Sequence, residues 1–198
     1  MKNIETALTT TATYSDDGSK RYLLRKVWDV QKPSLAIIML APSEASGIEL
    51  DNTTMLVLNN ASRLGYGSVS IVNLFATLGD FRLSYAENED SENIKTILDV
   101  AETADTVVYA AGVGKATNKS FVKRQDQVLM ALKPYEGKLK CLVSYDGKNR
   151  YQHPLSPKVR NWTLAEMKVS ELISADFKLT AESKKRKKQE KLSSSLLR

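Results

Sequence analysis

Four short apolar runs alternate with amphipathic stretches along the middle of the chain. The runs cover residues 35–40, 69–75, 106–111 and 139–144. An uninterrupted apolar run of this length is typical of a parallel strand that is buried on both faces. Apolar residues at helical spacing predict helices between and after these strands. The first predicted helix begins after Asp51 and ends near residue 65, and the others cover residues 91–102, 121–132 and 163–173.

This alternation predicts the fold class. Parallel strands need crossover connections, and helices in those connections cover both faces of the sheet. We therefore expect an α/β protein, a three-layer α/β/α sandwich with a four-stranded parallel central sheet. An antiparallel N-terminal hairpin is expected to precede the sheet, because Asp17-Gly18 is typical of a tight turn and residues 22–28 have the pattern of a strand.

The length of 198 residues fits one domain with a flexible segment at each end. Residues 1–13 are rich in threonine and show no clear period, which predicts a flexible N-terminal arm. Residues 14–180 are expected to form a single α/β domain. Residues 181–198 are expected to form a basic C-terminal tail.

The net charge of +6 is concentrated in that tail. Residues 181–198 hold seven basic and two acidic residues, and so carry +5 of the total. The basic block consists of Lys184, Lys185, Arg186, Lys187 and Lys188. Such a block repels itself and buries no face, so one interpretation is a solvated chain end. The other is an arm that contacts nucleic-acid phosphates without sequence preference.

Composition also excludes several classes of protein. A single cysteine, Cys141, rules out a disulfide framework within the chain, and its place in an apolar run predicts a buried small hydrophobe. A single histidine, His153, rules out mechanisms that need two. No apolar run approaches the ~20 residues of a membrane span, and the first residues lack the pattern of a signal peptide. We expect a cytoplasmic protein with no metal, no cofactor and no membrane contact.

Candidate chemistry lies in the loops after the four strands, because ligands of parallel sheets bind at the carboxyl ends of the strands. The first of these loops contains Pro42, Ser43 and Glu44 and leads to Asp51. Its backbone amides and hydroxyls suit an anion or a sugar, with carboxylates nearby. The alternative interpretation is a turn followed by a helix cap.

The second and third predicted strands are followed by different candidate site residues. Asn73 is a carboxamide late in an apolar strand, where it must find partners. It either pins a neighbouring loop or presents a donor and an acceptor to the edge of a nucleobase. Gly112 lies in a loop, residues 111–117, that lacks the residues of a P-loop but permits the close approach of a ligand or of another loop.

The fourth strand is followed by His153. A lone histidine is either structural or functional, and a place in a strand-end loop favours function. With Ser43 and Asp51, it could form a hydrolase triad. The chain has no Gly-x-Ser-x-Gly elbow, so the triad is a weak signal.

Six short motifs occur in one order between residues 20 and 160. They cover residues 21–28, 38–43, 51–54, 65–67, 72–76 and 153–155. In this set and order, the sequence resembles a bacterial and phage family catalogued as domain of unknown function 1643. Members more usually have Asn where this chain has Ala41, and a Trp-Gly pair where it has Ala111-Gly112.

That layout in turn resembles, more weakly, the uracil-DNA glycosylase superfamily, whose members have a four-stranded parallel sheet between helices. Residues 40–43 are similar to the first motif of that superfamily, and residues 153–155 to its late His-Pro-Ser motif. The resemblance implies that Asn73 reads the edge of a base. It also implies that His153 stabilises negative charge on a departing base.

The same resemblance implies roles for the neighbouring residues. Aromatic rings would stack on the base, and small or polar residues would surround it. The candidate rings are Phe75, Tyr151 and Tyr66, and the surrounding residues are Pro42, Ser43 and Gly112. Because Ala41 cannot activate water, Glu44 or Asp51 would have to do so.

The expected function is a glycosylase-like domain with a nucleobase-sized pocket, whose partner is nucleic acid or a nucleotide. Two alternatives remain open. One is a non-catalytic module on the same fold that binds nucleic acid or a protein. The other is a small-molecule hydrolase that uses Ser43 and His153. The sequence names neither the substrate nor the oligomeric state.

Overall fold

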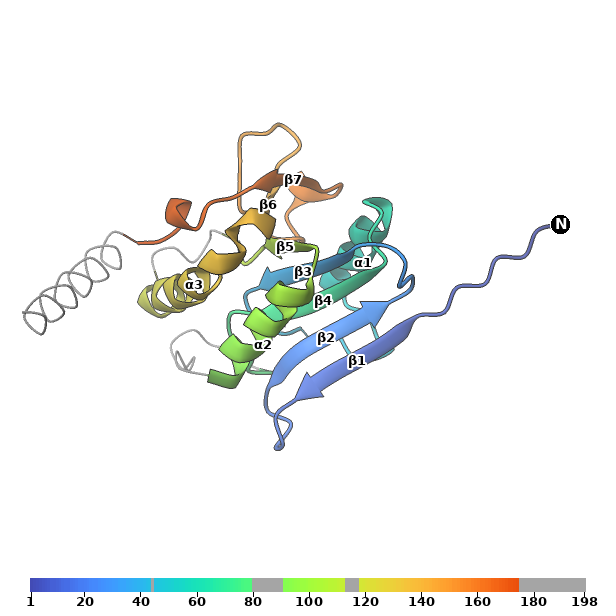
Figure 1. The fold of residues 1–198 in the computed structure, drawn as a ribbon, viewed down its shortest axis with the longest axis horizontal. Helices are drawn as coiled ribbons and strands as arrows, with labels where there is room; N and C mark the ends of the chain where they lie inside the picture. The colour runs from blue at the N-terminus through green and yellow to red at the C-terminus, as the bar shows by residue number, and fades with distance from the viewer. Residues whose placement is uncertain (44, 80–90, 113–117, 175–198) are drawn as a thin grey trace, which may run out of the picture.

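Seven strands form one mixed sheet through the middle of the molecule (Figure 1). The computed structural model describes residues 1–43, 45–79, 91–112 and 118–174. The strands lie in the order β1-β2-β4-β3-β5-β6-β7. They are β1 (Thr9–Tyr14), β2 (Arg21–Val27), β3 (Ser34–Met39), β4 (Ser68–Asn73), β5 (Thr106–Tyr109), β6 (Leu139–Val143) and β7 (Thr163–Glu166).

The predicted mixture of strands and helices is confirmed, but the predicted strand count is wrong, because the sheet has seven strands rather than four. Strands β3, β4, β5 and β6 pair in parallel. The N-terminal hairpin of β1 and β2 does not merely precede the sheet, since β2 pairs antiparallel with β4 and extends it. At the other side, β7 pairs antiparallel with β6. Both additions cover strand edges that would otherwise leave backbone groups unpaired.

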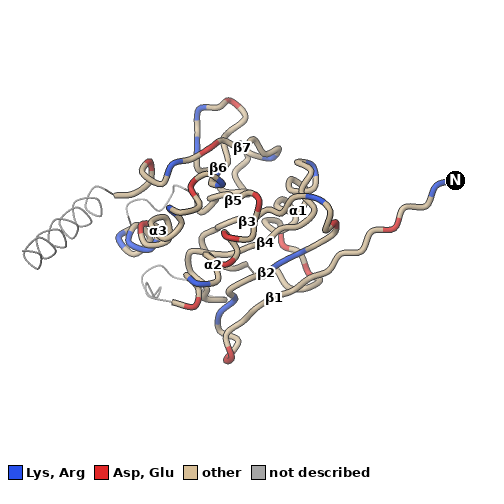
Figure 2. The backbone as a smooth tube through the Cα atoms, in the orientation of Figure 1, with Lys and Arg blue, Asp and Glu red and all other residues tan. Residues whose placement is uncertain are grey.

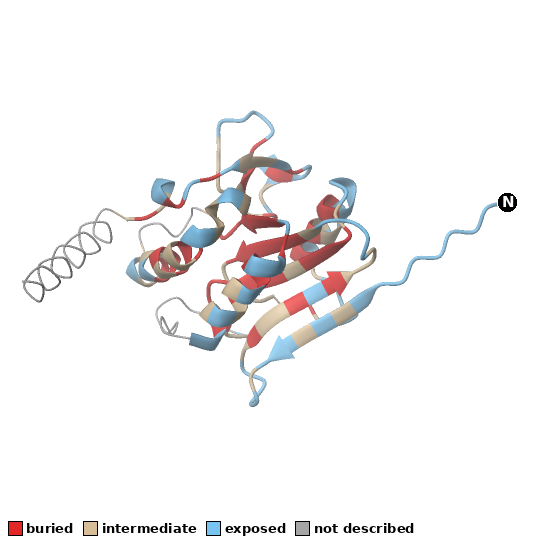
Figure 3. Cartoon of the chain, in the orientation of Figure 1, coloured by how far each residue is buried: buried red, intermediate tan, exposed pale blue. Residues whose placement is uncertain are grey.

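Helices cover both faces of the sheet. They are α1 (Asn52–Arg63), α2 (Ser91–Thr103) and α3 (Lys119–Ala131), with short 3₁₀ turns η1 (Lys133–Lys138), η2 (Pro157–Val159) and η3 (Val169–Glu171). Alternate residues of one strand point to opposite faces. Ile37 accordingly packs in the core with α1, whereas Ile38 packs in the core with α2 and α3. The central strands are almost entirely buried, as their red colour in Figure 3 shows.

Two sequence-based assignments are wrong at the ends of the described chain. Residues 163–173 were expected to form a helix, but they form β7 and η3. Leu164 and Ala165 favour a helix by local propensity, yet pairing with the open edge of β6 decides their conformation. Residues 9–13 of the expected flexible arm instead belong to β1, which begins at Thr9. The basic tail over residues 181–198 lies outside the described residues.

The amino ends of the parallel strands meet a tight turn at Gly67. Its carbonyl accepts hydrogen bonds from the amides of Trp28 and Asp29, each at 2.9 Å. A Cβ at this position would lie 1.8 Å from the Asp29 carbonyl oxygen, so only glycine fits. Among the described helices, none is both long and apolar enough to cross a membrane.

Candidate functional site

The loops after β3, β4, β5 and β6 meet at the carboxyl edge of the sheet. Leu74 and Phe75, which follow β4, donate their amides to the carbonyls of Met39 and Leu40 at 2.8 and 3.0 Å. Gly112, which follows β5, has a φ of 78° and lies against His153, whose Cβ is 3.6 Å from where a Gly112 Cβ would stand. The close approach expected of Gly112 is therefore made by another loop.

Two basic side chains of β2 donate hydrogen bonds to backbone carbonyls of the loop between β3 and α1. Arg21 is 2% exposed, and its Nη1 donates to the carbonyl oxygen of Ser43 at 3.2 Å and to that of Ala45. Lys26 is fully buried, and its Nζ donates to Gly47 O at 2.9 Å and to Thr10 Oγ1 at 3.0 Å. The central strands β3, β4 and β5 carry no charged residue, whereas β2 contains Lys and Arg residues, which are blue in Figure 2.

Asp51 is the N-cap of α1, as its place in the sequence predicted. Its Oδ1 accepts a hydrogen bond from the amide of Thr54 at 2.6 Å. Burial raises the pKa of Asp51, but hydrogen bonds from Ser43 and Thr54 and the charge of Arg21 outweigh burial and hold it below its ordinary value. The site therefore contains an ionised carboxylate at neutral pH.

Asn73 lies at the end of β4, on the face of the sheet that carries α1. In the β3–β4 register it stands opposite Met39, which packs with α1 in the core. Its side chain belongs to a residue only 1% exposed, and its Nδ2 has no hydrogen-bond partner among the described residues. A buried donor without an acceptor is costly. This amide group therefore keeps an unused hydrogen-bond donor at the end of β4.

The backbone at the end of β4 is fixed from the opposite face. The Nδ2 of Asn93 on α2 donates to the carbonyls of Asn73 and Leu74, at 3.0 and 3.1 Å. The Nε of Arg124 on α3 donates to the same Leu74 carbonyl at 2.7 Å. Both donor residues are fully buried. The strand end is therefore rigid, while the Asn73 side chain keeps its donor.

His153 is half-buried beside this edge, and its two ring nitrogens differ. Nδ1 accepts a hydrogen bond from the amide of Leu155 at 3.2 Å. The neutral ring must then carry its proton on Nε2, which leaves Nε2–H as a donor. Burial lowers the pKa of His153 below its ordinary value of 6.5, although the charge of Asp51 acts in the opposite direction. The ring is therefore neutral at pH 7.

Ser43 does not have the geometry of a triad nucleophile. Its hydroxyl oxygen is buried, and it lies close enough to Asp51 to lower the pKa of that carboxylate. In a Ser-His-Asp triad, the histidine lies between the other two and donates from Nδ1 to the carboxylate. Here Nδ1 of His153 accepts from Leu155 instead. The three residues are neighbours, but not in the order that activates a serine.

Several other expected site residues lie elsewhere. Phe75 is 2% exposed and packs in the core with α2 and α3. Tyr151 adopts a φ of 59°, and its hydroxyl donates to Glu171, away from the edge. Tyr66 lies at the amino ends of the strands, where its hydroxyl donates to Thr106 Oγ1 at 3.0 Å. Pro42 is half-buried in the loop above Arg21. Glu44 lies outside the described residues.

Sequence reasoning did not identify Arg21, Lys26, Asn93 and Arg124 as parts of this site. The available signal was a polar residue at an inward-facing position. Lys26 follows Leu24 by two residues and so shares its buried strand face. Asn93 precedes Ile97 by four residues on the buried face of α2.

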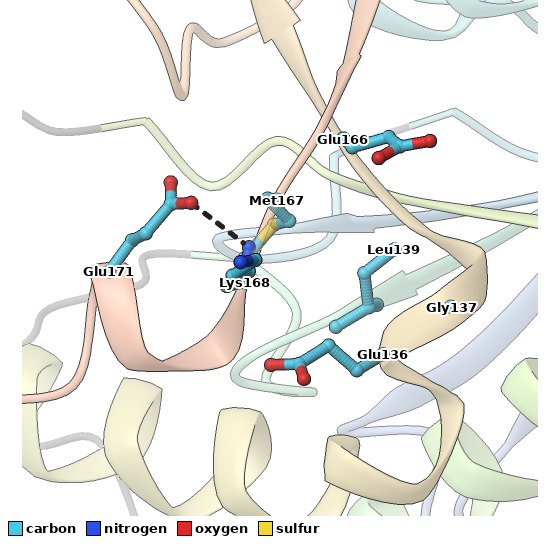
Figure 4. Close-up of a pocket in the computed structure, with 7 residues that line it drawn as sticks. All are labelled: Glu136, Gly137, Leu139, Glu166, Met167, Lys168 and Glu171. Carbon is cyan, nitrogen blue, oxygen red and sulfur yellow. Dashed lines mark hydrogen bonds between the residues drawn. The ribbon is translucent and has the colours of Figure 1, made fainter.

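A separate groove of about 380 Å³ lies at the amino end of β6 (Figure 4). Its lining residues are Glu136, Gly137, Leu139, Glu166, Met167, Lys168 and Glu171. The carboxylates of Glu136 and Glu171 accept hydrogen bonds from backbone amides, at 2.7 and 3.3 Å. Glu136 of η1 therefore holds η3 against η1, and Glu171 caps the start of its own 3₁₀ turn. Within the described ranges, no cluster of His, Cys, Asp and Glu side chains is arranged to hold a metal ion.

Comparison with models of known protein families identifies the family. A family model described as Protein of unknown function (DUF1643) matches residues 21–155. The matched region contains β2 to β6 and the loop as far as Leu155, and so includes each described element of the carboxyl edge. No curated protein and no solved structure matches the chain.

Proposed function

The chain belongs to the family of Protein of unknown function (DUF1643), and for this member we propose that the carboxyl edge of the sheet binds a nucleobase. The base would be presented by nucleic acid or by a nucleotide. The observation that carries the proposal is a pair of spare donors at this edge: Asn73 Nδ2, which is buried without a partner, and His153 Nε2–H. Carbonyl oxygens and ring nitrogens of a base are acceptors for such donors.

We further propose that the domain is a glycosylase-like hydrolase. When an N-glycosidic bond breaks, the bonding electrons leave with the base, and negative charge develops on its oxygen atoms. Nε2–H of His153 would donate a hydrogen bond to that oxygen in the transition state. The water oxygen forms the new bond to the sugar carbon, and the proton that the water loses ends on the departed base. The ionised Asp51 is the carboxylate that would orient this water.

The electrostatics of the edge support this assignment of roles. A neutral histidine donor stabilises a departing anion without first binding a proton from solution, and burial keeps His153 neutral. A carboxylate that stays ionised can accept a hydrogen bond from water, and hydrogen bonds keep Asp51 ionised. The two groups lie close enough for the charge of Asp51 to act on His153.

Release of free base tests the proposal. The wild-type chain is incubated with oligonucleotides that carry uracil, hypoxanthine or xanthine, and released base is measured by chromatography. We expect release from at least one substrate and loss of that release in His153→Ala. Tyr145→Ala is the matched control, because Tyr145 lies in the same loop but is 81% exposed. No release and no binding across the panel would contradict the proposal.

A second candidate is a module that binds a base without cleaving it. Asp51 already accepts the Thr54 amide and interacts with the Ser43 hydroxyl, which limits its capacity to activate water. The chain also has Ala41 at the position of a usual polar residue. Saturable binding of the oligonucleotides without base release would favour this candidate. The serine hydrolase is less favoured, because the Ser43 hydroxyl is buried.

The nucleic-acid partner is tested separately through the basic tail. Residues 181–198 carry +5, so their contact with phosphates would release counterions. Deletion of residues 182–198 is then expected to weaken oligonucleotide binding and to flatten its salt dependence. Unchanged affinity and salt slope would show that the tail is not the electrostatic arm.

A further inference from the structure

Arg21 is a charged side chain buried at the start of β2, beneath the carboxyl edge. It is 2% exposed, although a guanidinium is rarely buried unless it is paired. Its own amide donates to the Ala76 carbonyl at 2.9 Å, which fixes the backbone of Arg21 beside the end of β4. The side chain is therefore anchored within the sheet and extends toward the next loop.

The guanidinium contacts that loop at two points. Its Nη1 donates to the carbonyl oxygens of Ser43 and Ala45, both in the loop after β3. Six residues after Ala45, the same connection reaches Asp51 at the start of α1. Burial lowers the pKa of Arg21, while the charge of Asp51 and the hydroxyl of Tyr14 on β1 act against that change.

We propose that Arg21 is the positioning residue of the carboxyl-edge site. Its buried guanidinium fixes the loop after β3 and sets the Asp51 carboxylate in the arrangement that faces His153. A planar guanidinium suits this role because it presents several donors in a fixed geometry, whereas an ammonium is a point charge on a flexible stem. The role rests on the proposed function, because positioning matters only if the edge holds a ligand.

The experiment compares Arg21→Gln and Arg21→Lys with Arg25→Gln. Arg25 lies four residues later on the same strand and is exposed, so it is a matched control. The pKa of Asp51 is followed by ¹³C NMR of its carboxyl carbon, assigned with Asp51→Asn. Hydrogen exchange is followed at the amides of Ser46 and Thr54 in the loop and cap, and at Phe75 in the sheet edge.

In Arg21→Gln, we expect the pKa of Asp51 to rise and the Ser46 and Thr54 amides to exchange faster, with Phe75 unchanged. In Arg21→Lys, the pKa should remain low because the charge is kept, while the Ser46 amide still exchanges faster. If Arg21→Gln does not fold, Arg21→Lys alone decides, and unchanged exchange at Ser46 overturns the role. A uniform increase of exchange at all three amides, with the pKa of Asp51 unmoved, also overturns it, because Arg21 would then be a purely structural residue.

These measurements need no ligand, so they test the role of Arg21 separately from the proposed function. If the wild-type chain neither binds nor cleaves the oligonucleotide panel, the proposed function is wrong. The effect of Arg21 on the pKa of Asp51 can still be measured. An Arg21→Gln chain with an unshifted Asp51 would remove the role of Arg21. The base-release experiment on His153→Ala would then stand unchanged.

Discussion

The two ends of the parallel strands use polar residues in different ways. At the amino end, Ser34 donates both its amide and its hydroxyl to Asp105 Oδ2, each at 2.8 Å. Tyr66 donates to Thr106 in the same region, and the Gly67 carbonyl accepts two amides. At the carboxyl end, Asn73 Nδ2 has no partner within the described residues, and Nε2–H of His153 is left to donate.

This difference separates stability from binding capacity. Polar groups that are paired within the chain hold turns together and have little left to offer a ligand. Polar groups that are buried but incompletely paired lower the stability of the chain. Such groups contribute little to holding the fold together. Substitutions at the amino end should therefore lower stability, whereas substitutions at the carboxyl end should lower binding or activity.

The largest expected effect is that of His153→Ala on activity. A donor to a developing negative charge lowers the activation barrier by ~3–4 kcal/mol. Without this donor, base release should fall about a hundredfold or more. The melting temperature should change little, because the hydrogen bond from the Leu155 amide to the ring lies in an exposed segment. Single-turnover base release and thermal unfolding on the same preparation check both parts. A large drop in melting temperature with activity retained would identify His153 as structural.

Gly67→Ala tests the amino end. A Cβ there would overlap the Asp29 carbonyl oxygen, and relief of that overlap must move backbone rather than a flexible side chain. We expect a loss of about 3 kcal/mol in the free energy of unfolding, measured by urea denaturation. Oligonucleotide binding by the folded fraction should be unchanged. Gly137→Ala is the control, since nothing lies within 4 Å of the Cβ it would add.

Asn73→Leu is expected to change stability and base binding in opposite directions at one residue. The substitution removes a buried N–H without a partner and keeps a similar side-chain volume, so the free energy of unfolding should rise by about 1 kcal/mol. Base discrimination should disappear, because the donor is gone. Denaturation and binding to the oligonucleotide panel provide the two readouts. A variant that is less stable yet binds as before would place Asn73 among the loop-pinning residues.

The smallest expected effect is a dependence of stability on pH. The folded chain holds the pKa of His153 below 6.5, so the unfolded chain takes up a proton first as the pH falls. Stability should therefore decline as the pH drops below 6.5, while above this value His153 contributes nothing. His153→Gln should remove this decline and keep a donor near Nε2. Because the chain has one histidine, its NMR titration assigns the effect directly.

Much of the fold was predictable because it depends on short segments. Continuous apolar runs identified the four parallel strands, and helical spacing identified α1, α2 and α3 to within a few residues. Asp51 was recognised as a cap from its place before an apolar helix, and Gly112 as a point of close approach. In each case the signal lies within a few residues of the feature that it predicts.

Other features were decided by contacts between distant segments. Residues 163–166 have the composition of a helix but pair with β6, because the edge of a sheet offers backbone hydrogen bonds that a short isolated helix cannot match. Tyr151 turns to Glu171, twenty residues away, and not toward the site. No local pattern contains that information.

By itself, the sequence determined the four parallel strands and the helices α1, α2 and α3, and that a loop follows each parallel strand. Its single histidine also limited the site chemistry. Only the tertiary structure decided which polar side chains keep free donors and which are consumed by partners. It paired Arg21 with a loop twenty-two residues away, and it left the Asn73 amide without an acceptor in the described chain. Hydrogen-bond satisfaction depends on all neighbours in space at once, and a linear sequence specifies those neighbours only through the completed fold.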